Sequence, residues 1–438
     1  MIMNRIFIFE FVSGGGFNKI DIPSSLFCEG YGMLRSIITD FKKMNFEVTT
    51  LLDARISYLS NYLNVDTVKY VNEQEDYITN FKKMLIDCES IFIIAPEFSN
   101  ILYDLTKIAQ DHKKRILSID LKGIQLGASK IKTYEYFKNN HIETPETYQI
   151  PTSNGLDINF IVKKLNTIKA PIVLKPDDGV GAESIYYFED QSQIHNFFKE
   201  ARNQFDVNRK YVLQKYIEGE DLSASLIGYQ QNTKDLPLSP VLLSINFQDI
   251  KIKNTKSDSE YLGGYTPIEN YSLVHKLLLK ILDKLDLSMF NSYFGIDFIR
   301  NKNDLTLIEI NPRLTTSYIG IRNIINRNPA EIIIKNFSKS PEMHHLKISK
   351  HSIFRRLELK YTGEFSLKKI IETHIPKIVK KIPEIITPPI SFNISNQSIH
   401  TDFSCFIATK EKDIHNSKKR LSKIIDILHK EFNFTLIK

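Results

Sequence analysis

Two apolar segments place two carboxylates and one amide on what reads as a single β-hairpin. The first segment is "FGIDFI" (residues 294–299), with Asp297 in the middle of the run. The second is "LIEINPR" (residues 307–313), with Glu309 and Asn311 among apolar residues. Side chains two apart on a strand point to the same face, so Glu309 and Asn311 share one face.

The connection between these segments decides which side chains face each other. A short polar turn, Asn301–Asp304, is typical of a β-hairpin. Asp297 lies directly across from Glu309 only if the loop has an odd number of residues, so we predict a three-residue loop at Lys302–Asp304. Two carboxylates and an amide oxygen on one face would suit Mg²⁺, because nucleotide phosphates complete its shell. The alternative is a surface ribbon with scattered polar residues, although burying Glu309 without a partner is costly.

A glycine-containing loop joins two apolar strands upstream, in "PIVLKPDDGVGAESIYYF" (residues 171–188). Lys175 ends the first strand, and Gly179 and Gly181 lie in the loop. Glycine lets the backbone fold closely over phosphates and present its N–H groups to them, and Lys175 would add a positive charge. A strand follows the loop, which excludes the Walker P-loop and the Rossmann fingerprint. Alone, the segment fits an ordinary turn as well as a nucleotide flap.

The next pair of strands flanks an acidic turn in "YVLQKYIEGEDLSASLIGY" (residues 211–229). An extended hinge of this kind can bind adenine through the backbone groups of Lys215 and Ile217. Gln214 would then lie near the exocyclic amine, and Asp221 would accept hydrogen bonds from the ribose hydroxyls. An amphipathic hairpin with an acidic turn is the alternative.

A helix is predicted from Lys130 to about Asn139, because Ser129 can cap its start and Pro145 follows its end. Lys130 in the first turn can reach a phosphate, or it can be an ordinary solvated lysine.

In this order, the parts resemble the ATP-grasp superfamily over residues 126–325. The resemblance implies binding of ATP and of two Mg²⁺ ions, which Mn²⁺ can replace. It implies metal ligands at Asp297, Glu309 and Asn311, and phosphate-binding lysines at Lys130 and Lys175. It also implies a flap at Gly179 and Gly181, and an arginine at Arg313 that steadies the transferred phosphoryl group. The implied adenosine contacts are Gln214, Lys215, Ile217 and Asp221. Gly295 departs from some amino-acid ligases of this superfamily, which have arginine there, so their substrate contacts cannot be copied.

The amino-terminal region narrows the resemblance. It contains "RIFIFEFVSGGG" (residues 5–16) and "CEGYGML" (residues 28–34). With "YLGGYTPIE" (residues 261–269) and "EINPRLTTSY" (residues 309–318), this opening resembles the tyramine–glutamate ligases of methanofuran synthesis, which join the γ-carboxylate of glutamate to an aromatic amine.

The resemblance implies an ATP-dependent carboxylate–amine ligase that forms an amide through an acyl phosphate. Its partners would be a small-molecule carboxylate and an amine such as tyramine or tyrosine. The alternatives are a ligase that adds an amino acid to another C1-carrier coenzyme or peptide, a kinase-like transfer, and a non-catalytic nucleotide-binding protein on the same fold.

Substrate contacts are expected from charged and hydroxyl side chains near the nucleotide. Glu29 could take an ammonium group, and Arg313 or Arg322 could hold a second carboxylate through two parallel hydrogen bonds. The candidates are Glu10, Glu29, Arg55, Arg322 and Thr315, with Tyr261 and Tyr265 for an aromatic amine.

The length of 438 residues allows two or three cores, and 42% hydrophobic with 25% charged residues is typical of a soluble globular chain. We expect a multidomain α/β and α+β fold. It would comprise a Rossmann-like pre-ATP-grasp domain with a parallel sheet (1–125), a two-lobed ATP-grasp core (126–340) and a small α+β module (346–438). Within this module, the proline-broken segment 376–390 is expected to be irregular, and an amphipathic helix closes the chain.

The net charge of +7 is spread along the chain without a basic block, which argues against a nucleic-acid partner. Three widely separated cysteines form no disulfide framework, as expected in a reducing cytoplasm. The apolar runs are strand-sized and too short to cross a membrane. The sequence leaves a homo-oligomer open.

Overall fold

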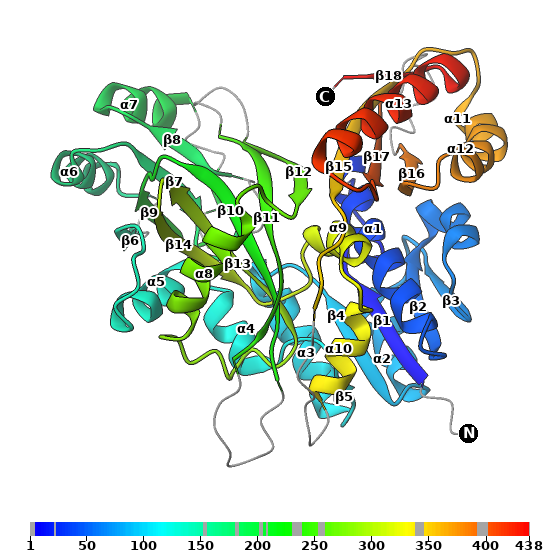
Figure 1. The fold of residues 1–438 in the computed structure, drawn as a ribbon, viewed down its shortest axis with the longest axis horizontal. Helices are drawn as coiled ribbons and strands as arrows, with labels where there is room; N and C mark the ends of the chain where they lie inside the picture. Colours follow the sequence, from blue (N-terminus) through cyan, green and yellow to red (C-terminus); the bar gives the residue numbers. More distant parts are fainter. Residues whose placement is uncertain are drawn as a thin grey trace.

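Three β-sheets organise the chain (Figure 1). The computed structural model describes residues 5–21, 23–151, 156–179, 184–200, 205–206, 209–229, 239–252, 259–337, 346–391 and 402–437. Within these ranges, no helix combines the length and the apolar character needed to cross a membrane.

The first sheet is parallel, and its strands are apolar because helices cover its faces. Its order is β3 (Thr67–Val71), β2 (Glu47–Asp53), β1 (Arg5–Glu10), β4 (Ser90–Ile94) and β5 (Arg115–Ile116). The accompanying helices are α1 (Ser24–Lys42), α2 (Tyr77–Ile86), α3 (Ile101–Asp111) and the 3₁₀ helices η1 (Ala54–Tyr62) and η2 (Phe98–Asn100). The predicted parallel-sheet domain is confirmed, although edge strand β3, which is mostly not buried, has no clear sequence signal.

The second sheet has four antiparallel strands and forms a small lobe with two helices on it (Figure 1). Its order is β6 (Thr147–Gln149), β9 (Tyr211–Lys215), β7 (Ile172–Pro176) and β8 (Tyr186–Phe188), with α6 (Ile158–Ile168) and α7 (Gln191–Glu200). Aromatic side chains, including Phe188 and Phe197, fill the core between the sheet and these helices. Helix α5 (Lys130–Asn139) precedes the lobe with the predicted bounds, and its cap Ser129 accepts from the N–H of Lys132 at 3.3 Å.

The third sheet has nine strands and includes both the ATP-grasp region and the carboxyl-terminal region. Its order is β14 (Asp304–Asn311), β13 (Tyr293–Asn301), β10 (Glu220–Ile227), β11 (Val241–Lys251), β12 (Glu260–Thr266), β15 (Ser352–Tyr361), β17 (Asp402–Ala408) and β16 (Ile385–Ile390), with β18 (Phe434–Leu436) paired to β15. The remaining helices are α4 (Leu121–Gly127), α8 (Tyr271–Leu282), α9 (Ser317–Ile324), α10 (Pro329–Asn336), α11 (Leu367–Lys369), the π-helix η3 (Ile370–His374), α12 (Ile375–Lys381) and α13 (Ile414–Phe432).

The pairing of β12 with β15 therefore continues one sheet across the expected boundary near residue 340. The division into 1–125, 126–340 and 346–438 stays a proposal. The prediction that 376–390 is irregular is wrong, because α12 and β16 lie there. Pro376 lies directly after the π-helical segment η3, in a helical run that continues from α11 into α12, and Pro388 lies in a strand at the end of the sheet.

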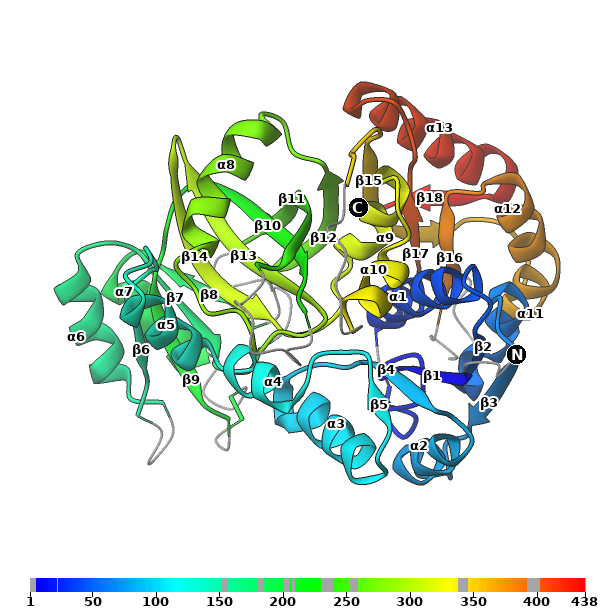
Figure 2. The same ribbon diagram turned by 60° about the horizontal axis from the view of Figure 1, so that its bottom comes forward.

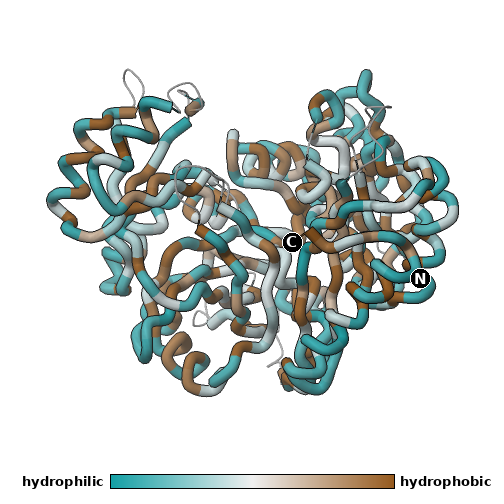
Figure 3. Tube along the Cα trace, turned by 90° about the horizontal axis from the view of Figure 1, so that it is seen from above, coloured by the Kyte–Doolittle hydropathy of each residue, from teal (hydrophilic) through white to brown (hydrophobic). Residues whose placement is uncertain are grey.

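Helix α1 joins the amino-terminal sheet to the carboxyl-terminal strands β16 and β17 (Figure 2). The guanidinium of Arg35 donates to the carbonyl of Ile386 at 2.6 Å, and Thr387 Oγ1 donates to the carbonyl of Cys28 at 2.7 Å. Apolar residues of the helix belong to a core that also includes residues of β1, β15 and β17. In Figure 3, the half of the molecule that contains the N-terminus has apolar segments inside and hydrophilic segments along its outer turns.

The β13–β14 hairpin reaches the predicted register by a different route. Asp297 does lie opposite Glu309, but the turn contains only two residues, 302 and 303. The predicted three-residue loop is therefore wrong. A β-bulge between the Asp297 and Phe298 pairs leaves Ile308 as the extra residue and restores the register. Lys302 takes a left-handed conformation with φ of 56°, which a two-residue hairpin turn requires.

The bulge also changes which side chains face the same way. Ile308 and Glu309 are adjacent in sequence, yet both line the same cavity. Leu307 and Ile310, on either side of them, are buried in the core. The extra residue thus turns Glu309 away from the core and toward the cavity.

Gly264 on β12 allows close approach of the strands on both sides, so Gly264→Ala should lower the free energy of unfolding by about 1–3 kcal/mol. An added Cβ would lie 1.8 Å from the carbonyl oxygen of Phe247 and 3.1 Å from the ring of Phe354. Urea unfolding followed by circular dichroism measures the change. In the control Gly179→Ala the Cβ meets nothing nearer than 3.4 Å, so an equal loss in both variants would contradict this account.

Candidate functional site

A cavity of about 570 Å³ lies where the amino-terminal region, the central region with the small lobe, and the carboxyl-terminal region meet. Its walls come from the small lobe, from strands β10 to β14, from the amino-terminal domain and from β15. Its volume is typical of a site for small-molecule ligands. Most of the residues that the sequence predicts as functional line it, namely Glu10, Glu29, Lys130, Lys175, Gly179, Gln214, Lys215, Ile217, Asp221, Asp297, Glu309, Asn311, Arg313 and Thr315.

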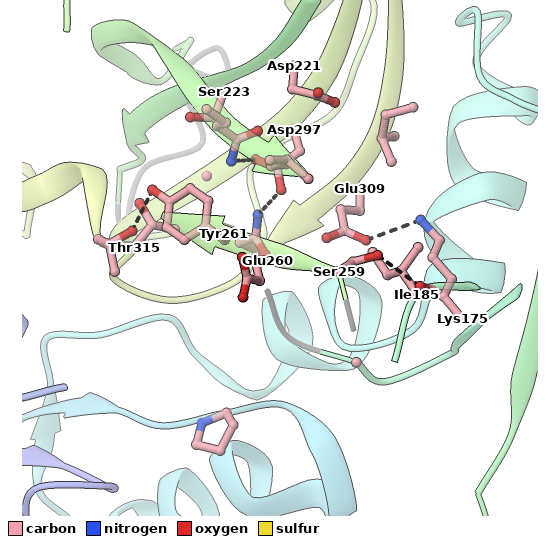
Figure 4. A pocket seen from close by; sticks show the side chains of 18 of the residues that line it. Lys175, Ile185, Asp221, Ser223, Ser259, Glu260, Tyr261, Asp297, Glu309 and Thr315 are labelled. Carbon is pink, nitrogen blue, oxygen red and sulfur yellow. Dashed lines mark hydrogen bonds and ion pairs between the residues drawn. The ribbon is translucent and has the colours of Figure 1, made fainter. Parts of the chain in front are cut away.

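Two carboxylates occupy one wall of this cavity (Figure 4). Burial and the neighbouring charge of Glu309 raise the pKa of Asp297 to about 7. Two amides donate to the Asp297 carboxylate, from Asn311 Nδ2 at 2.9 Å and from Gln248 Nε2 at 3.3 Å. Two carboxylates held this close repel each other, so the wall favours a cation between them.

Two lysines face Glu309 from the opposite side. Glu309 Oε2 lies 3.2 Å from Lys130 Nζ and 3.8 Å from Lys175 Nζ. Burial raises the pKa of Glu309, but these two ammonium groups outweigh it and hold the pKa below its ordinary value. Burial lowers the pKa of Lys175 to about 8, although Glu309 attracts its proton. The lysines therefore form a positively charged region that suits phosphate groups.

The chain fits a magnesium ion at this wall. Glu309 Oε2 is buried, and apart from its ion pairs with Lys130 and Lys175 it has no hydrogen-bond partner within the part of the chain that the structure describes. Over the same ranges, no group of three His, Cys, Asp or Glu converges, so the donors here are two carboxylates and the amide of Asn311. Mg²⁺ suits such an incomplete set because it is held by one or two carboxylates together with substrate phosphates. Asn311 would present its amide oxygen in place of the nitrogen that now bonds Asp297.

The strand β9 and the turn after it form the hinge side of the cavity. Gln214 is buried, and its Nε2 donates to Thr147 Oγ1 at 2.8 Å. The N–H of Lys215 donates to the carbonyl of Glu146 at 2.9 Å, so only its carbonyl could serve an adenine ring. Asp221 lines the same side, and burial raises its pKa to about 6.

The structure adds Glu97, which the sequence analysis missed. Its carboxylate accepts from Arg313 Nε at 3.0 and 3.1 Å. Burial lowers the pKa of Arg313, but Glu97 together with Asp297 and Glu309 raises it above the ordinary value. Glu97 lies three residues beyond β4, at the carboxyl end of a parallel strand, where ligand-binding residues are common. That position was the signal that could have found it.

Three predicted substrate residues do not line the cavity: Arg55, Arg322 and Tyr265, whose ring stacks on Phe247 with centroids 4.8 Å apart, whereas Tyr261 does line it. Arg55 is bound to Asp53, with Nη2 2.7 Å from its carboxylate, and to the carbonyls of Phe17 and Ile20. Arg322 is bound to the buried Asp40 through two hydrogen bonds, at 2.5 and 2.7 Å. These partners make both arginines structural, which removes them from the candidate substrate contacts. Gly181 lies outside the described residues.

Comparison with protein families identifies the domains around this cavity. Residues 127–317 match the model of the ATP-grasp domain, and residues 46–124 match that of the pre ATP-grasp 3 domain. This chain contains a pre-ATP-grasp domain followed by an ATP-grasp domain. The predicted resemblance to the ATP-grasp superfamily is confirmed, and its limits, 126–325, agree closely with the matched range.

A curated relative supports the narrower resemblance. The tyramine–L-glutamate ligase of Methanocaldococcus jannaschii is 27% identical over 357 residues, which cover 81% of this ATP-grasp chain and 96% of the relative. The predicted similarity to tyramine–glutamate ligases is thus confirmed over most of both chains.

Solved structures agree on the ATP-grasp fold. The biotin carboxylase domain of the Hydrogenobacter thermophilus 2-oxoglutarate carboxylase, in complex with magnesium ADP, has a TM-score of 0.67 at 13% identity and covers 100% of this chain and 91% of that one. The L-amino acid ligase of Bacillus licheniformis has a TM-score of 0.62 at 12% identity, with 99% and 98% coverage. At such identities these structures establish the fold alone.

The half-buried carboxylate of Asp221 should reduce stability near neutral pH. Its folded-state pKa of about 6 lies above the ordinary 3.8, so folding favours the protonated form. The resulting destabilisation is absent well below pH 3.8, grows as the pH rises and is complete above about pH 6. Asp221→Asn should therefore raise the free energy of unfolding at pH 7.5 by up to about 3 kcal/mol and by less at pH 5.

Urea unfolding at the two pH values measures this difference. Asp304→Asn, at the exposed first residue of β14, is the control and should change little at either pH. A gain for Asp221→Asn that is the same at both pH values would show that the burial of this carboxylate is not the cause.

Proposed function

We propose that this chain is an ATP-dependent carboxylate–amine ligase that joins the γ-carboxylate of glutamate to an aromatic amine such as tyramine. The observation that carries the proposal is the arrangement of charges in the cavity. The carboxylates of Asp297 and Glu309 lie on one wall, and the ammonium groups of Lys130 and Lys175 approach Glu309. The cavity has room for a nucleotide and further small molecules. The relationship to the Methanocaldococcus jannaschii tyramine–L-glutamate ligase supports this pair of substrates.

The reaction has two steps. A carboxylate oxygen of the acid attacks the γ-phosphorus of ATP in line, so that an acyl phosphate forms and ADP leaves. The neutral amine then attacks the acyl carbon, and inorganic phosphate leaves with one oxygen of the original carboxylate. The amine loses one proton as the amide forms. In such transfers the protein contributes mainly positioning and charge neutralisation.

The chain supplies these contributions through side chains fixed by buried contacts. Lys130 and Lys175 would hold the phosphate oxygens, since both ammonium groups already point at the same carboxylate. Arg313 would lie beside the transferred phosphoryl group, and Glu97 fixes its orientation. Magnesium, when bound by Asp297, Glu309 and Asn311, would neutralise charge on the phosphates.

The nucleotide would extend from these groups to the hinge. Adenine would meet the carbonyl of Lys215, the N–H of Ile217 and the region of Gln214, while Asp221 would accept from the ribose hydroxyls. We propose two Mg²⁺ ions, which Mn²⁺ can replace, and action in the cytoplasm on two small molecules.

ADP release is the direct test of this proposal. With magnesium ATP, L-glutamate and tyramine, ADP should form at a rate that depends on both substrates, and mass spectrometry should find the condensed amide. Replacing tyramine with tyrosine or with aliphatic amines defines the amine. ADP release that does not depend on an amine, without an amide product, would contradict ligation.

Glu309→Gln should lower kcat/KM about 1000-fold, because it removes several kcal/mol of transition-state stabilisation at the phosphates. The coupled ADP assay measures the loss, and circular dichroism shows whether the variant is folded. Asp304→Asn on the same hairpin keeps the strand pairing and serves as the matched control. Normal turnover by Glu309→Gln would remove Glu309 from the proposed metal site.

A further inference from the structure

An ion pair lies in the part of the cavity that the proposed nucleotide contacts leave unused. Arg356 on β15 donates through Nη1 to Glu29 on α1, and both side chains line the cavity. They are largely buried, with 13% and 16% of each side chain exposed. On its other edge, Arg356 Nε lies 2.7 Å from Glu358 Oε1, and Ser404 Oγ donates to Glu358 Oε2 at 2.7 Å.

The other positively charged residues that line this cavity each have a place in the proposed nucleotide site. Among the described residues that line it, the basic ones are Lys130, Lys175, Lys215, Arg313 and Arg356. The first two face Glu309, and Arg313 is bound by Glu97. Lys215 lies on the hinge strand β9. Arg356 is therefore the basic group among these to which the proposed nucleotide contacts give no role, and its partner Glu29 lines the cavity with it.

We propose that Glu29 and Arg356 together bind the head group of an α-amino acid. The carboxylate of Glu29 takes the α-ammonium group, and the guanidinium of Arg356 takes the α-carboxylate. This inference rests on the proposed ligase function and names its acid substrate by class, as a zwitterionic amino acid that reacts through its side-chain carboxylate.

The exchange of partners keeps every buried charge paired. Glu29 turns from Arg356 to the ligand's ammonium group, and the ligand's carboxylate takes the place of Glu29 on the guanidinium. Glu358 stays beside Arg356 Nε throughout. A zwitterion adds no net charge to the site. A ligand without an ammonium group would leave Glu29 without a new partner, and a ligand without an α-carboxylate would leave Arg356 without one. Such a loss is costly because the site is largely shielded from water.

The location of the pair also explains why the side chain reacts. Tyr261 lines the cavity, and its phenol interacts with the charges of both Glu29 and Asp297, which together with burial raise its pKa. Its oxygen accepts from Thr316 Oγ1 at 2.8 Å, and Figure 4 shows the ring beside Asp297 and Thr315. A head group held at Arg356 would leave the side-chain carboxylate to extend past Tyr261 toward the metal wall.

This assignment gives the carboxyl-terminal region a direct part in substrate binding. Arg356 lies on the strand β15, which continues the ATP-grasp sheet through β12. Glu29 comes from the amino-terminal domain, 327 positions earlier in the chain. The subsite exists only when both regions are packed on the core.

Substrate analogues test the two charges separately. L-Glutamate carries both, glutarate lacks the α-ammonium group, and 4-aminobutyrate lacks the α-carboxylate. In the wild-type protein with magnesium ATP and tyramine, kcat/KM for ADP release should be about 100-fold lower with either analogue than with L-glutamate. Equal use of glutarate and L-glutamate would overturn the proposal.

Variants then assign each charge to its residue. Arg356→Gln should raise KM for L-glutamate at least 30-fold with little change in KM for ATP, and its penalty should shrink below threefold with 4-aminobutyrate. Glu29→Gln should behave in the same way toward L-glutamate, with its penalty shrinking for glutarate. The matched control is Arg355→Gln on the same strand, since Arg355 pairs with Asp249 at 2.7 Å and does not line the cavity. An equal loss for all three acids would show a purely structural role and overturn the proposal.

Direct binding separates this inference from the proposed function. Isothermal titration with L-glutamate, glutarate and 4-aminobutyrate, in the presence of magnesium and a non-hydrolysable ATP analogue, needs no turnover. Selective binding of L-glutamate that Arg356→Gln abolishes would support the head-group site even if no amine yields a product. Turnover of L-glutamate with no effect of Arg356→Gln on KM or binding would keep the ligase and refute the site.

Discussion

The repulsion between two partly buried carboxylates, Asp297 and Glu309, is the constraint on which the rest of this structure depends. Their strands are neighbours, and the register places the two side chains opposite each other. Lys130 and Lys175 balance part of the negative charge, while burial and the charge of Glu309 still raise the pKa of Asp297. A cation and a polyphosphate together would complete it, because each supplies the charge that the other side needs.

Several local features serve this arrangement. The bulge at Ile308 turns Glu309 toward the cavity, and the start of α5 is fixed so that Lys130 meets it. Asp177 accepts from Ser129 Oγ at 2.8 Å and from the N–H of Ile131 at 2.9 Å, which anchors this helix end to the strand that carries Lys175. Arginine–carboxylate pairs also join distant parts of the chain: Arg313 with Glu97 and Arg356 with Glu29 beside the cavity, and Arg322 with Asp40 outside it.

Features that depend on local sequence patterns could be predicted from the sequence. The cap at Ser129 gave the bounds of α5, apolar runs gave the parallel sheet, and the order of motifs gave the ATP-grasp resemblance. The sequence could not predict the bulge, because a two-residue turn with one extra residue gives the same register as a three-residue loop. It also missed Glu97 and Arg356, whose partners lie 216 and 327 positions away along the chain. Such pairs follow from packing, which no local pattern reports.

Oxygen transfer from the acid substrate tests the central claim, that this cavity activates a carboxylate by phosphorylation. L-Glutamate labelled with ¹⁸O in its γ-carboxylate would be turned over with magnesium ATP and tyramine, and the released phosphate would be analysed by mass spectrometry. The acyl phosphate mechanism predicts one ¹⁸O atom in each phosphate formed. Unlabelled phosphate accompanying ADP release would show that water, and not the carboxylate, receives the phosphoryl group, and would contradict the account.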